Sequence, residues 1–404
     1  MTVSERWLLP DGVDELLPPE AWQVELMRRR MLDTYSRHGY ELVSPPLIEY
    51  LESLLTGTGN DLDLQTFKLT DQLTGRMMGV RADITPQVAR IDTHLLKRRG
   101  VNRLCYVDTV VHTRPAHMLT NRSPMQIGCE LFGEVGVAAD IEIISLMLET
   151  LHLVGIEAVH IDLAHVGIYR GLIESASLNK SVENQVFDAL SRKSIPELDA
   201  LAQNAPESAD IILAIRDIAN LSGGVEALDK IRLSAEKLTP ASAKVVGVAI
   251  DQLQNISQQI QQRFAGVEIG FDFCELRGYN YHTGVMFAAY TPTYGHALAK
   301  GGRYDDIGKD FGESRPATGF SADLKTLVRV VERAPQDSLG KEVPAGASGV
   351  LAPVGNSEAL LDKIAQLRKT HRVIQLLSEQ ETTETYGCSQ RLTFQAGQWQ
   401  LEEI

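Results

Sequence analysis

The chain has little basic charge, and it lacks any long apolar run. Its 53 Asp and Glu residues outnumber 39 Lys and Arg residues, for a formal net charge of −14, and no long basic block offsets the excess. Such a molecule as a whole repels a phosphate backbone, which argues against tRNA or another nucleic acid as a partner. No segment approaches the roughly 20 apolar residues of a membrane-spanning helix, and the N-terminus lacks a signal-peptide core.

Cysteines are also scarce and widely spaced. The four of them occur without a C-x-x-C pair, at Cys105, Cys129, Cys274 and Cys388. This spacing favours unpaired thiols in a reducing cytosol over a disulfide framework or a zinc site. His112 and His117 share a loop that offers no clear third ligand. We therefore expect a cytoplasmic protein without a metal or another cofactor.

What the chain does have is enough apolar residues for a large core, and marked changes in composition along its length. At 404 residues and 44% apolar content it is long enough for two or three domains. Residues 166–264, rich in Ala, Leu, Lys, Glu and Gln, predict a helical insertion between two parts of one core, residues 1–165 and 265–334. Residues 334–349 are rich in Pro, Gly, Ser and Ala, which is typical of a linker. Residues 350–404 predict a small unit made of one βαβ motif and a hairpin.

Two segments of the first part have clear periodicity. From Glu20 to Arg37 large apolar residues recur at helical spacing, at Trp22, Leu26, Met31 and Tyr35. The following strand, Tyr40 to Val43, runs into Ser44-Pro45-Pro46, which suits an edge strand because proline donates no ladder hydrogen bond. A core helix is expected from Asp140 to Val154, ended by Gly155.

The stretch from Glu268 to Gly302 predicts a hairpin that carries a pocket. Alternating apolar residues indicate strands on both sides of a polar hinge, where four polar or aromatic side chains gather beside glycines: Arg277, Asn280, Tyr281 and His282. Such convergence is typical of the floor of a small-molecule site. A buried hairpin with one satisfied arginine is the alternative.

Polar residues elsewhere could line the same site. Gln126, Gly128 and Glu130 alternate with apolar residues and therefore share one strand face, which is either a pocket lining or a solvent-exposed surface. Asp83 and Thr85 precede Pro86, where a helix can begin. They are therefore candidates for helix capping or for ligand binding.

Several motifs, in order, resemble the class II core of histidyl-tRNA synthetases. They are the proline-rich opening, Val80-Arg81-Ala82-Asp83-Ile84-Thr85-Pro86, the strand pair from Arg103 to Glu130, Leu276 to Gly284, and Gly301-Gly302-Arg303-Tyr304-Asp305. The likeness covers about residues 5–333. It implies an α+β fold in which a class II aminoacyl-tRNA synthetase-like antiparallel sheet is flanked by helices, with a helical insertion and a small C-terminal α/β unit.

The chain departs from that family where the family grips ATP. By the resemblance, His112 stands at the arginine that clamps the ATP phosphate, Arg114 at a nearby glutamate, and Thr326 at the arginine of the third motif. Lys325 is one residue off and would point about 100° away on a helix. Losing one preorganised donor to a developing charge costs about 3 kcal/mol, and two are absent here.

The residues that bind the amino acid in the synthetase family have more counterparts in this chain than the residues that bind ATP. The resemblance places Asp83 at the group that binds the substrate ammonium, Gln126 and Glu130 along the histidine side chain, and Arg277 near the carboxylate. Tyr281 matches the first of the family's paired tyrosines, whereas His282 replaces the second. The predicted histidine site has no catalytic residue and no metal, and it comprises Asp83, Thr85, Arg114, Gln126, Glu130, Arg277, Gly278, Tyr281 and His282.

A synthetase core with this pocket, without the ATP grip and with a shortened C-terminus, resembles the regulatory subunits of ATP phosphoribosyltransferase. That family implies a non-catalytic chain that self-associates as a dimer within a hetero-oligomer. It would activate the short-form catalytic subunit in the first step of histidine biosynthesis and carry feedback inhibition by histidine as effector. No phosphoribosyl-diphosphate loop is found in the sequence. The alternatives are a divergent histidyl-tRNA synthetase and a stand-alone sensor of histidine or uncharged tRNA.

Overall fold

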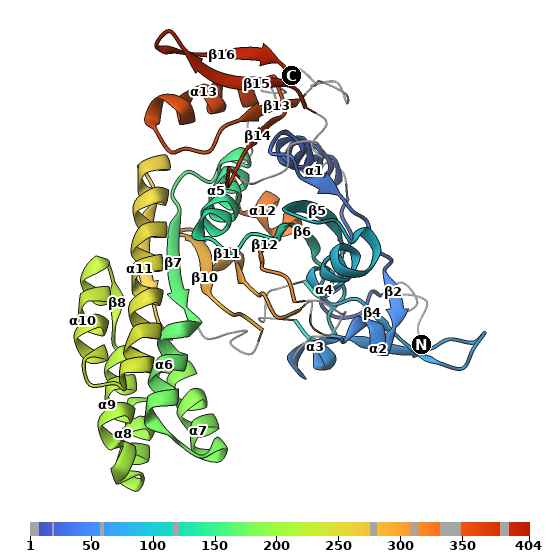
Figure 1. Ribbon diagram of the computed structural model, residues 1–404. Helices are drawn as coiled ribbons and strands as arrows, with labels where there is room; N and C mark the ends of the chain where they lie inside the picture. Colours follow the sequence, from blue (N-terminus) through green and yellow to red (C-terminus); the bar gives the residue numbers. More distant parts are fainter. Residues whose placement is uncertain are drawn as a thin grey trace.

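The protein is described by a computed structural model (Figure 1), which covers residues 8–17, 20–56, 60–115, 121–274, 281–307, 309, 314–331, 349–379 and 388–404. Residues 275–280, with Arg277 and Gly278, and nearly all of the expected linker lie outside these ranges. Within them, no helix has both the length and the apolar character that crossing a bilayer requires.

A nine-stranded sheet forms the centre of the molecule, in the order β1-β5-β6-β12-β11-β10-β7-β9-β8. Its strands are β1 (Glu41–Leu42), β5 (Asn102–Thr109), β6 (Met125–Phe132), β7 (His160–His165), β8 (Ser222–Gly223), β9 (Glu268–Asp272), β10 (Val285–Thr291), β11 (Tyr294–Arg303) and β12 (Ala317–Asp323). Most neighbours are antiparallel, but β1 with β5 and β7 with β9 are parallel. The expected edge strand is confirmed, because β1 ends the order.

The strand pairing expected for Glu268 to Gly302 is wrong. Strands β9 and β10 are not partners, because β7 lies between them: His160 of β7 faces Glu268 of β9, while His165 of β7 faces Val285 of β10. The true hairpin is β10 with β11, which turns between Thr291 and Tyr294.

Helices cover one face of the sheet (Figure 1). They are α1 (Glu20–Arg37), α5 (Val137–Leu153), α11 (Pro240–Arg263) and α12 (Leu324–Val330). Their apolar sides and the sheet residues facing them form the main core, which includes Met31, Ile127, Leu146 and Phe320. Trp22, however, is 63% exposed. Helical spacing shows that an apolar stripe exists, but it does not reveal which part of that stripe the sheet will cover. The opposite face of the sheet carries Gln126 and Glu130.

Helices α6 to α11 occupy the region where the insertion was expected. The first five are α6 (Val166–Ala176), α7 (Lys180–Ser191), α8 (Ile195–Asn204), α9 (Ala209–Ala219) and α10 (Val225–Ala235), with a 3-10 turn at Pro206–Ser208. Helix α6 leaves β7 directly, and α11, which packs along it, leads back into β9. The insertion is therefore a crossover between two adjacent parallel strands.

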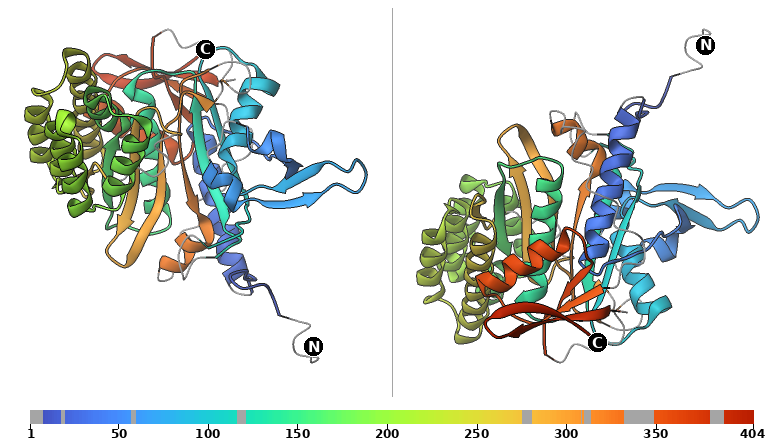
Figure 2. Two further views of the ribbon diagram at one scale, coloured as in Figure 1. Left: turned by 90° about the horizontal axis from the view of Figure 1, so that it is seen from below. Right: turned by 90° about the horizontal axis from the view of Figure 1, so that it is seen from above.

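A small sheet of β2 (Ile48–Tyr50), β4 (Met77–Val80) and β3 (Phe67–Thr70) projects from the body as an arm (Figure 2). Leu73, at the tip of the β3–β4 hairpin, is 94% exposed. Short helices flank the arm and lead to the site: α2 (Leu51–Leu54), α3 (Asn60–Gln65) and α4 (Thr85–Arg90), which continues as a π-helix, Ile91–Leu96.

The C-terminal unit contains the expected βαβ motif and hairpin. Its sheet has the order β14-β13-β15-β16. The elements are β13 (Gly349–Ala352), α13 (Glu358–Arg368), β14 (Val373–Gln375), β15 (Cys388–Gln395) and β16 (Gln398–Glu403). Helix α13 covers one face, with Leu360 and Ile364 packed on Val350 and Leu392. The other face lies toward α1 and α5 (Figure 1).

Candidate functional site

A buried carboxyl group, that of Glu130 on β6, is the centre of the site. It is 1% exposed and accepts hydrogen bonds from Thr85 Oγ1 at 3.0 Å, from Tyr106 OH at 3.1 Å and from Tyr304 OH. Burial raises the pKa of Glu130 to about 8, although the bonds from Tyr304 and Thr85 act in the opposite direction. The carboxyl group therefore holds its proton to a higher pH than an exposed glutamate does.

Two glycines leave the space in which this cluster sits. A Cβ atom at Gly319 of β12 would lie 1.6 Å from Glu130 Oε2, and one at Gly128 of β6 would lie 2.6 Å from Tyr106 OH. Gly128 and Tyr106 are direct cross-strand partners, and so are Gly319 and Glu130. The floor of the site is therefore formed by the backbone at these two glycines, and the side chains of Glu130 and Tyr106 pack on it.

Asp83 and Gln126 form the second part of the site. Gln126 Nε2 donates to Asp83 Oδ1 at 2.7 Å, and Gln126 Oε1 accepts from the backbone N–H of Ile84 at 2.9 Å. Asp83 Oδ1 also accepts from the backbone N–H of Thr85 at 3.1 Å, at the start of α4. The capping alternative is thus partly right for Asp83, whereas the Thr85 hydroxyl points to Glu130.

Tyr281 adds a buried hydroxyl group to the site. Its ring stacks on that of Tyr304, with centroids 5.1 Å apart and planes 20° apart. The hydroxyl is buried, and it makes no hydrogen bond within the described part of the chain. Burial, together with the nearby Glu130 and Asp83, raises the pKa of Tyr281 well above its usual value. A buried hydroxyl without a partner costs free energy unless a ligand or water satisfies it.

His282 contacts Arg303 and Arg170 rather than the hydrogen-bonded cluster at Glu130. Its Nδ1 lies 3.3 Å from the carbonyl oxygen of Arg303, and its own carbonyl accepts from Arg170 at 2.9 Å. Burial lowers the pKa of His282 to about 4, so the ring is neutral at pH 7, with the proton on Nδ1. Arg114 is exposed, and no contact within the described residues joins it to Glu130.

The structure therefore brings together Asp83, Thr85, Gln126, Glu130 and Tyr281. It also adds Tyr106 and Tyr304, which the sequence analysis did not assign to the site. Tyr304 lies in the Gly301 to Asp305 motif, where a tyrosine after two glycines was a usable signal. Tyr106 lies in a strand that is otherwise apolar, where a tyrosine is easily taken for core.

The positions where a synthetase would hold ATP are engaged in contacts within the protein. His112 Nε2 lies 2.9 Å from the carbonyl oxygen of Ala82, and Thr326 Oγ1 donates to Asp323 at 2.6 Å. The Lys325 ammonium, on a side chain 6% exposed, donates to Asp14 at 3.1 Å and to the Ser123 carbonyl at 2.8 Å. Within the described residues, no group of three or more His, Cys, Asp or Glu side chains is arranged to hold a metal.

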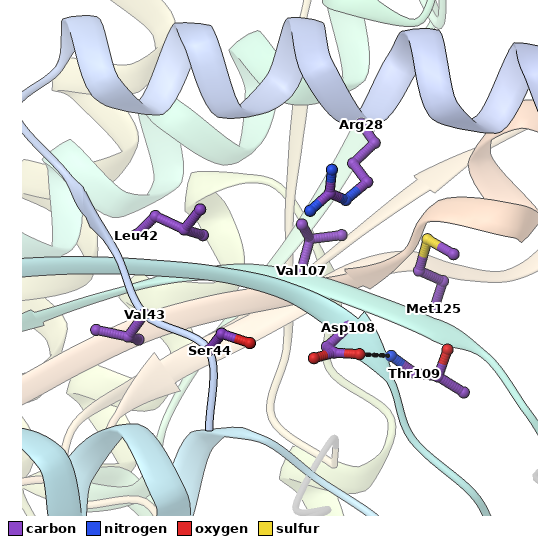
Figure 3. A pocket seen from close by; sticks show the side chains of 8 residues that line it. All are labelled: Arg28, Leu42, Val43, Ser44, Val107, Asp108, Thr109 and Met125. Carbon is purple, nitrogen blue, oxygen red and sulfur yellow. Dashed lines mark hydrogen bonds between the residues drawn. The ribbon is translucent and has the colours of Figure 1, made fainter. Parts of the chain in front are cut away.

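A separate hollow of about 180 Å³ lies on the other face of the sheet, between α1 and the β1 edge (Figure 3). Arg28 of α1 reaches over it from one side (Figure 3). Asp108, at its base, accepts from the backbone N–H of Thr109 at 2.8 Å and pairs with the buried Arg81 at 2.8 Å. The rest of the lining is Leu42, Val43, Ser44, Val107 and Met125.

Comparison with known proteins places this geometry in a class. Residues 12–327 match the family model of histidyl-tRNA synthetase, so the core is of the class II synthetase type. Residues 347–402 match the model described as the ATP phosphoribosyltransferase subunit HisZ C-terminal domain. The ATP phosphoribosyltransferase regulatory subunits of Marinobacter nauticus and Stutzerimonas stutzeri are 53% and 49% identical to this chain, each over 100% of both proteins. The chain belongs to the ATP phosphoribosyltransferase regulatory subunit family.

Solved structures agree on the fold. A Bacillus halodurans protein titled ATP phosphoribosyltransferase regulatory subunit/histidyl-tRNA synthetase superimposes with a TM-score of 0.72 at 23% identity, covering 94% of each chain. The histidyl-tRNA synthetase of Nostoc gives a TM-score of 0.66 at 18% identity, covering 98% of this chain and 94% of its own. These likenesses confirm the fold class expected from the sequence.

Proposed function

We propose that this chain is the non-catalytic regulatory subunit of an ATP phosphoribosyltransferase complex, which activates the short catalytic subunit and mediates feedback inhibition by histidine. The family membership supports the regulatory role. The main support for histidine binding without catalysis is the contrast between the amino-acid pocket and the positions where a synthetase binds ATP. Asp83, Thr85, Gln126 and Tyr281 lie around the buried carboxyl group of Glu130, whereas Lys325, one residue before the position of the synthetase arginine in the third motif, is paired with Asp14.

The pocket supplies a partner for two of the polar ends of histidine. The Asp83 carboxylate suits the ammonium group, and Glu130 suits the imidazole together with the Tyr281 hydroxyl, which has no partner among the described residues. Charge-assisted contacts of this kind contribute about 1.5–3 kcal/mol each. Arg277, outside the described residues, remains our proposal for the histidine carboxylate. Feedback inhibition further requires that histidine bind two states of the complex unequally.

The test is to mix the chain with the short catalytic subunit and to assay transferase activity with and without histidine. We expect activation by the wild-type chain and loss of that activation on adding histidine. Glu130→Ala should still activate but should resist histidine, and calorimetric titration should show weaker binding. Glu403→Ala, on the exposed end of β16, is the control and should behave as wild type. Equal histidine affinity for wild type and Glu130→Ala would refute the pocket.

The rival function, a working synthetase, makes a different prediction for the chain alone. It requires histidine-dependent exchange of pyrophosphate into ATP. Measurable exchange by the purified chain would overturn the non-catalytic assignment.

We also propose that two copies associate through the β1 edge. This edge is unpaired in the sheet order, and exposed apolar side chains surround it: Trp22, Leu42, Leu47 and Ile48. The neighbouring hollow at Arg28 would receive a side chain of the second copy. In sedimentation experiments Leu42→Glu should shift the chain toward the monomer, whereas Leu233→Glu, at an exposed apolar residue on α10, should not.

The free cysteines support a cytoplasmic location.

A further inference from the structure

Helix α5 carries a stripe of polar residues that is covered by the C-terminal unit. Glu142, Ser145 and Glu149 recur at helical spacing on a helix whose other residues are largely apolar and buried. In an isolated core this stripe would face water. In the full chain β14 of the C-terminal unit lies next to α5 (Figure 1).

The contacts across this junction are specific. Glu142 holds Arg103 through bonds of 2.8 and 3.0 Å, and the same guanidinium donates to the Gln375 carbonyl of β14 at 3.3 Å. Arg263, at the end of α11, donates to Ser145 at 3.3 Å and to Asn356 of the C-terminal unit at 2.9 Å.

Two further contacts complete the junction. Ile374 of β14 packs directly on Gly39, where a Cβ atom would lie 2.8 Å from it. Glu149 pairs with the buried His38 at 2.8 Å. Although burial alone would raise the pKa of Glu149, His38 and then Arg368 of α13 lower it to about 2. Across the junction the C-terminal unit is thus held by hydrogen bonds from Arg103 and Arg263 and by the packing of Ile374, and Arg368 of α13 adds positive charge near Glu149.

The first turn of the same helix holds the histidine pocket. Asp140, which is buried, accepts from Arg303 at 3.0 and 3.2 Å, and Arg303 also donates to the carbonyls of Glu134 and Gly136 at 3.0 Å. The next residue, Tyr304, donates to Glu130 and stacks on Tyr281. The carbonyl of Arg303 in turn fixes His282.

We infer that α5 couples the histidine pocket to the C-terminal unit: binding of histidine beside the Tyr281–Tyr304 stack and docking of the unit on the Glu142, Ser145 and Glu149 stripe stabilise each other. The helix has 17 residues and spans about 26 Å as one rigid rod. Because coupling between two sites is reciprocal, weakening the dock must weaken histidine binding. This inference rests on the proposed function, since it takes histidine as the ligand.

The test uses the full chain. Hydrogen exchange of the amides in β13, α13 and β14 is measured with and without histidine, and histidine affinity is measured calorimetrically. Arg368→Met and Asn356→Ala alter the dock from the C-terminal side alone and leave the pocket intact. Lys369→Met, at an exposed residue beside Arg368, is the matched control.

We expect histidine to slow exchange in the C-terminal unit, and Arg368→Met to weaken histidine binding at least about fivefold, the lower end of common coupling strengths. Asn356→Ala should weaken it less, and Lys369→Met should not change it. If histidine binds but exchange is unaltered, or if both junction variants keep wild-type affinity, the coupling is refuted while the pocket assignment stands. If histidine does not bind wild type, the pocket assignment fails as well.

Discussion

Gly319 of β12 and Glu130 of β6 are direct partners on adjacent strands, and they lie so close that position 319 has no room for a side chain. A Cβ atom at position 319 would lie 1.6 Å from Glu130 Oε2 and 2.8 Å from the carbonyl oxygen of Cys129. The carboxyl group accepts hydrogen bonds from Thr85, Tyr106 and Tyr304, so it cannot move aside without breaking them. The position of the carboxyl group therefore depends on this glycine.

Gly319→Ala should accordingly damage both stability and binding. We expect a loss of about 1–3 kcal/mol in the free energy of unfolding, as for other overpacked cores, together with loss of histidine binding. Urea unfolding and calorimetry measure the two effects. Gly295→Ala, in β11 with no atom near its added methyl group, is the control and should change stability by less than about 0.5 kcal/mol. A Gly319→Ala chain as stable as this control would contradict the crowding.

The raised pKa of Glu130 gives a dependence of stability on pH. Between 4.5 and about 8 the folded chain keeps a proton that the unfolded chain has released. The stability that this proton provides is complete below 4.5 and is lost as pH rises through about 8. Glu130→Gln lacks this titration. Its stability relative to wild type should therefore increase across that window and level off above it, as urea unfolding at a series of pH values would show. A constant difference would mean that Glu130 titrates normally.

Removing the hydroxyl group from each of the two stacked tyrosines should affect different properties of the protein. Tyr304→Phe removes a donor to the buried Glu130, and we expect it to cost about 1–3 kcal/mol of stability. Tyr281→Phe removes a hydroxyl that makes no hydrogen bond in the part of the chain the structure describes, so stability should change little while histidine binding weakens. Thermal unfolding and calorimetry on both variants separate these effects. Equal stability losses would show that the Tyr281 hydroxyl is satisfied in the free protein.

Ligands should shift the melting temperature selectively. Histidine at about 100 times its Kd should stabilise the chain by about 2.7 kcal/mol and raise its Tm. ATP with magnesium should leave Tm unchanged, because Lys325 is paired with Asp14, and His112 is hydrogen-bonded to the Ala82 carbonyl. A rise in Tm with ATP would show that the nucleotide site still works.

Much of the fold could be predicted from the sequence, because periodicity reports local structure well. The helix from Glu20 to Arg37, the pairing of β5 with β6 and the C-terminal βαβ motif were expected and are found. Periodicity does not report which strands become neighbours. The position of β7 between β9 and β10 depends on a crossover of about a hundred residues that no local pattern reveals.

The site could be predicted in part for a similar reason. Alternation placed Gln126 and Glu130 on one strand face, and the resemblance to synthetases added Asp83, Thr85 and Tyr281. Tyr106 was missed because a tyrosine between apolar residues looks like core. Arg114 does not join the cluster, because β5 ends at Thr109 and the residue before Arg114, Thr113, is hydrogen-bonded to Leu64 and Gln65.

Because β7 and β9 are adjacent and parallel, the chain leaves the sheet and re-enters it at neighbouring positions, and α6 and α11 form the two sides of a stem there. Helices α7 to α10 lie beyond that stem. A change in α7 to α9 can therefore leave the pocket strands β5, β6 and β12 as they are, whereas a change that removes β8, between α9 and α10, would leave the edge of β9 unpaired.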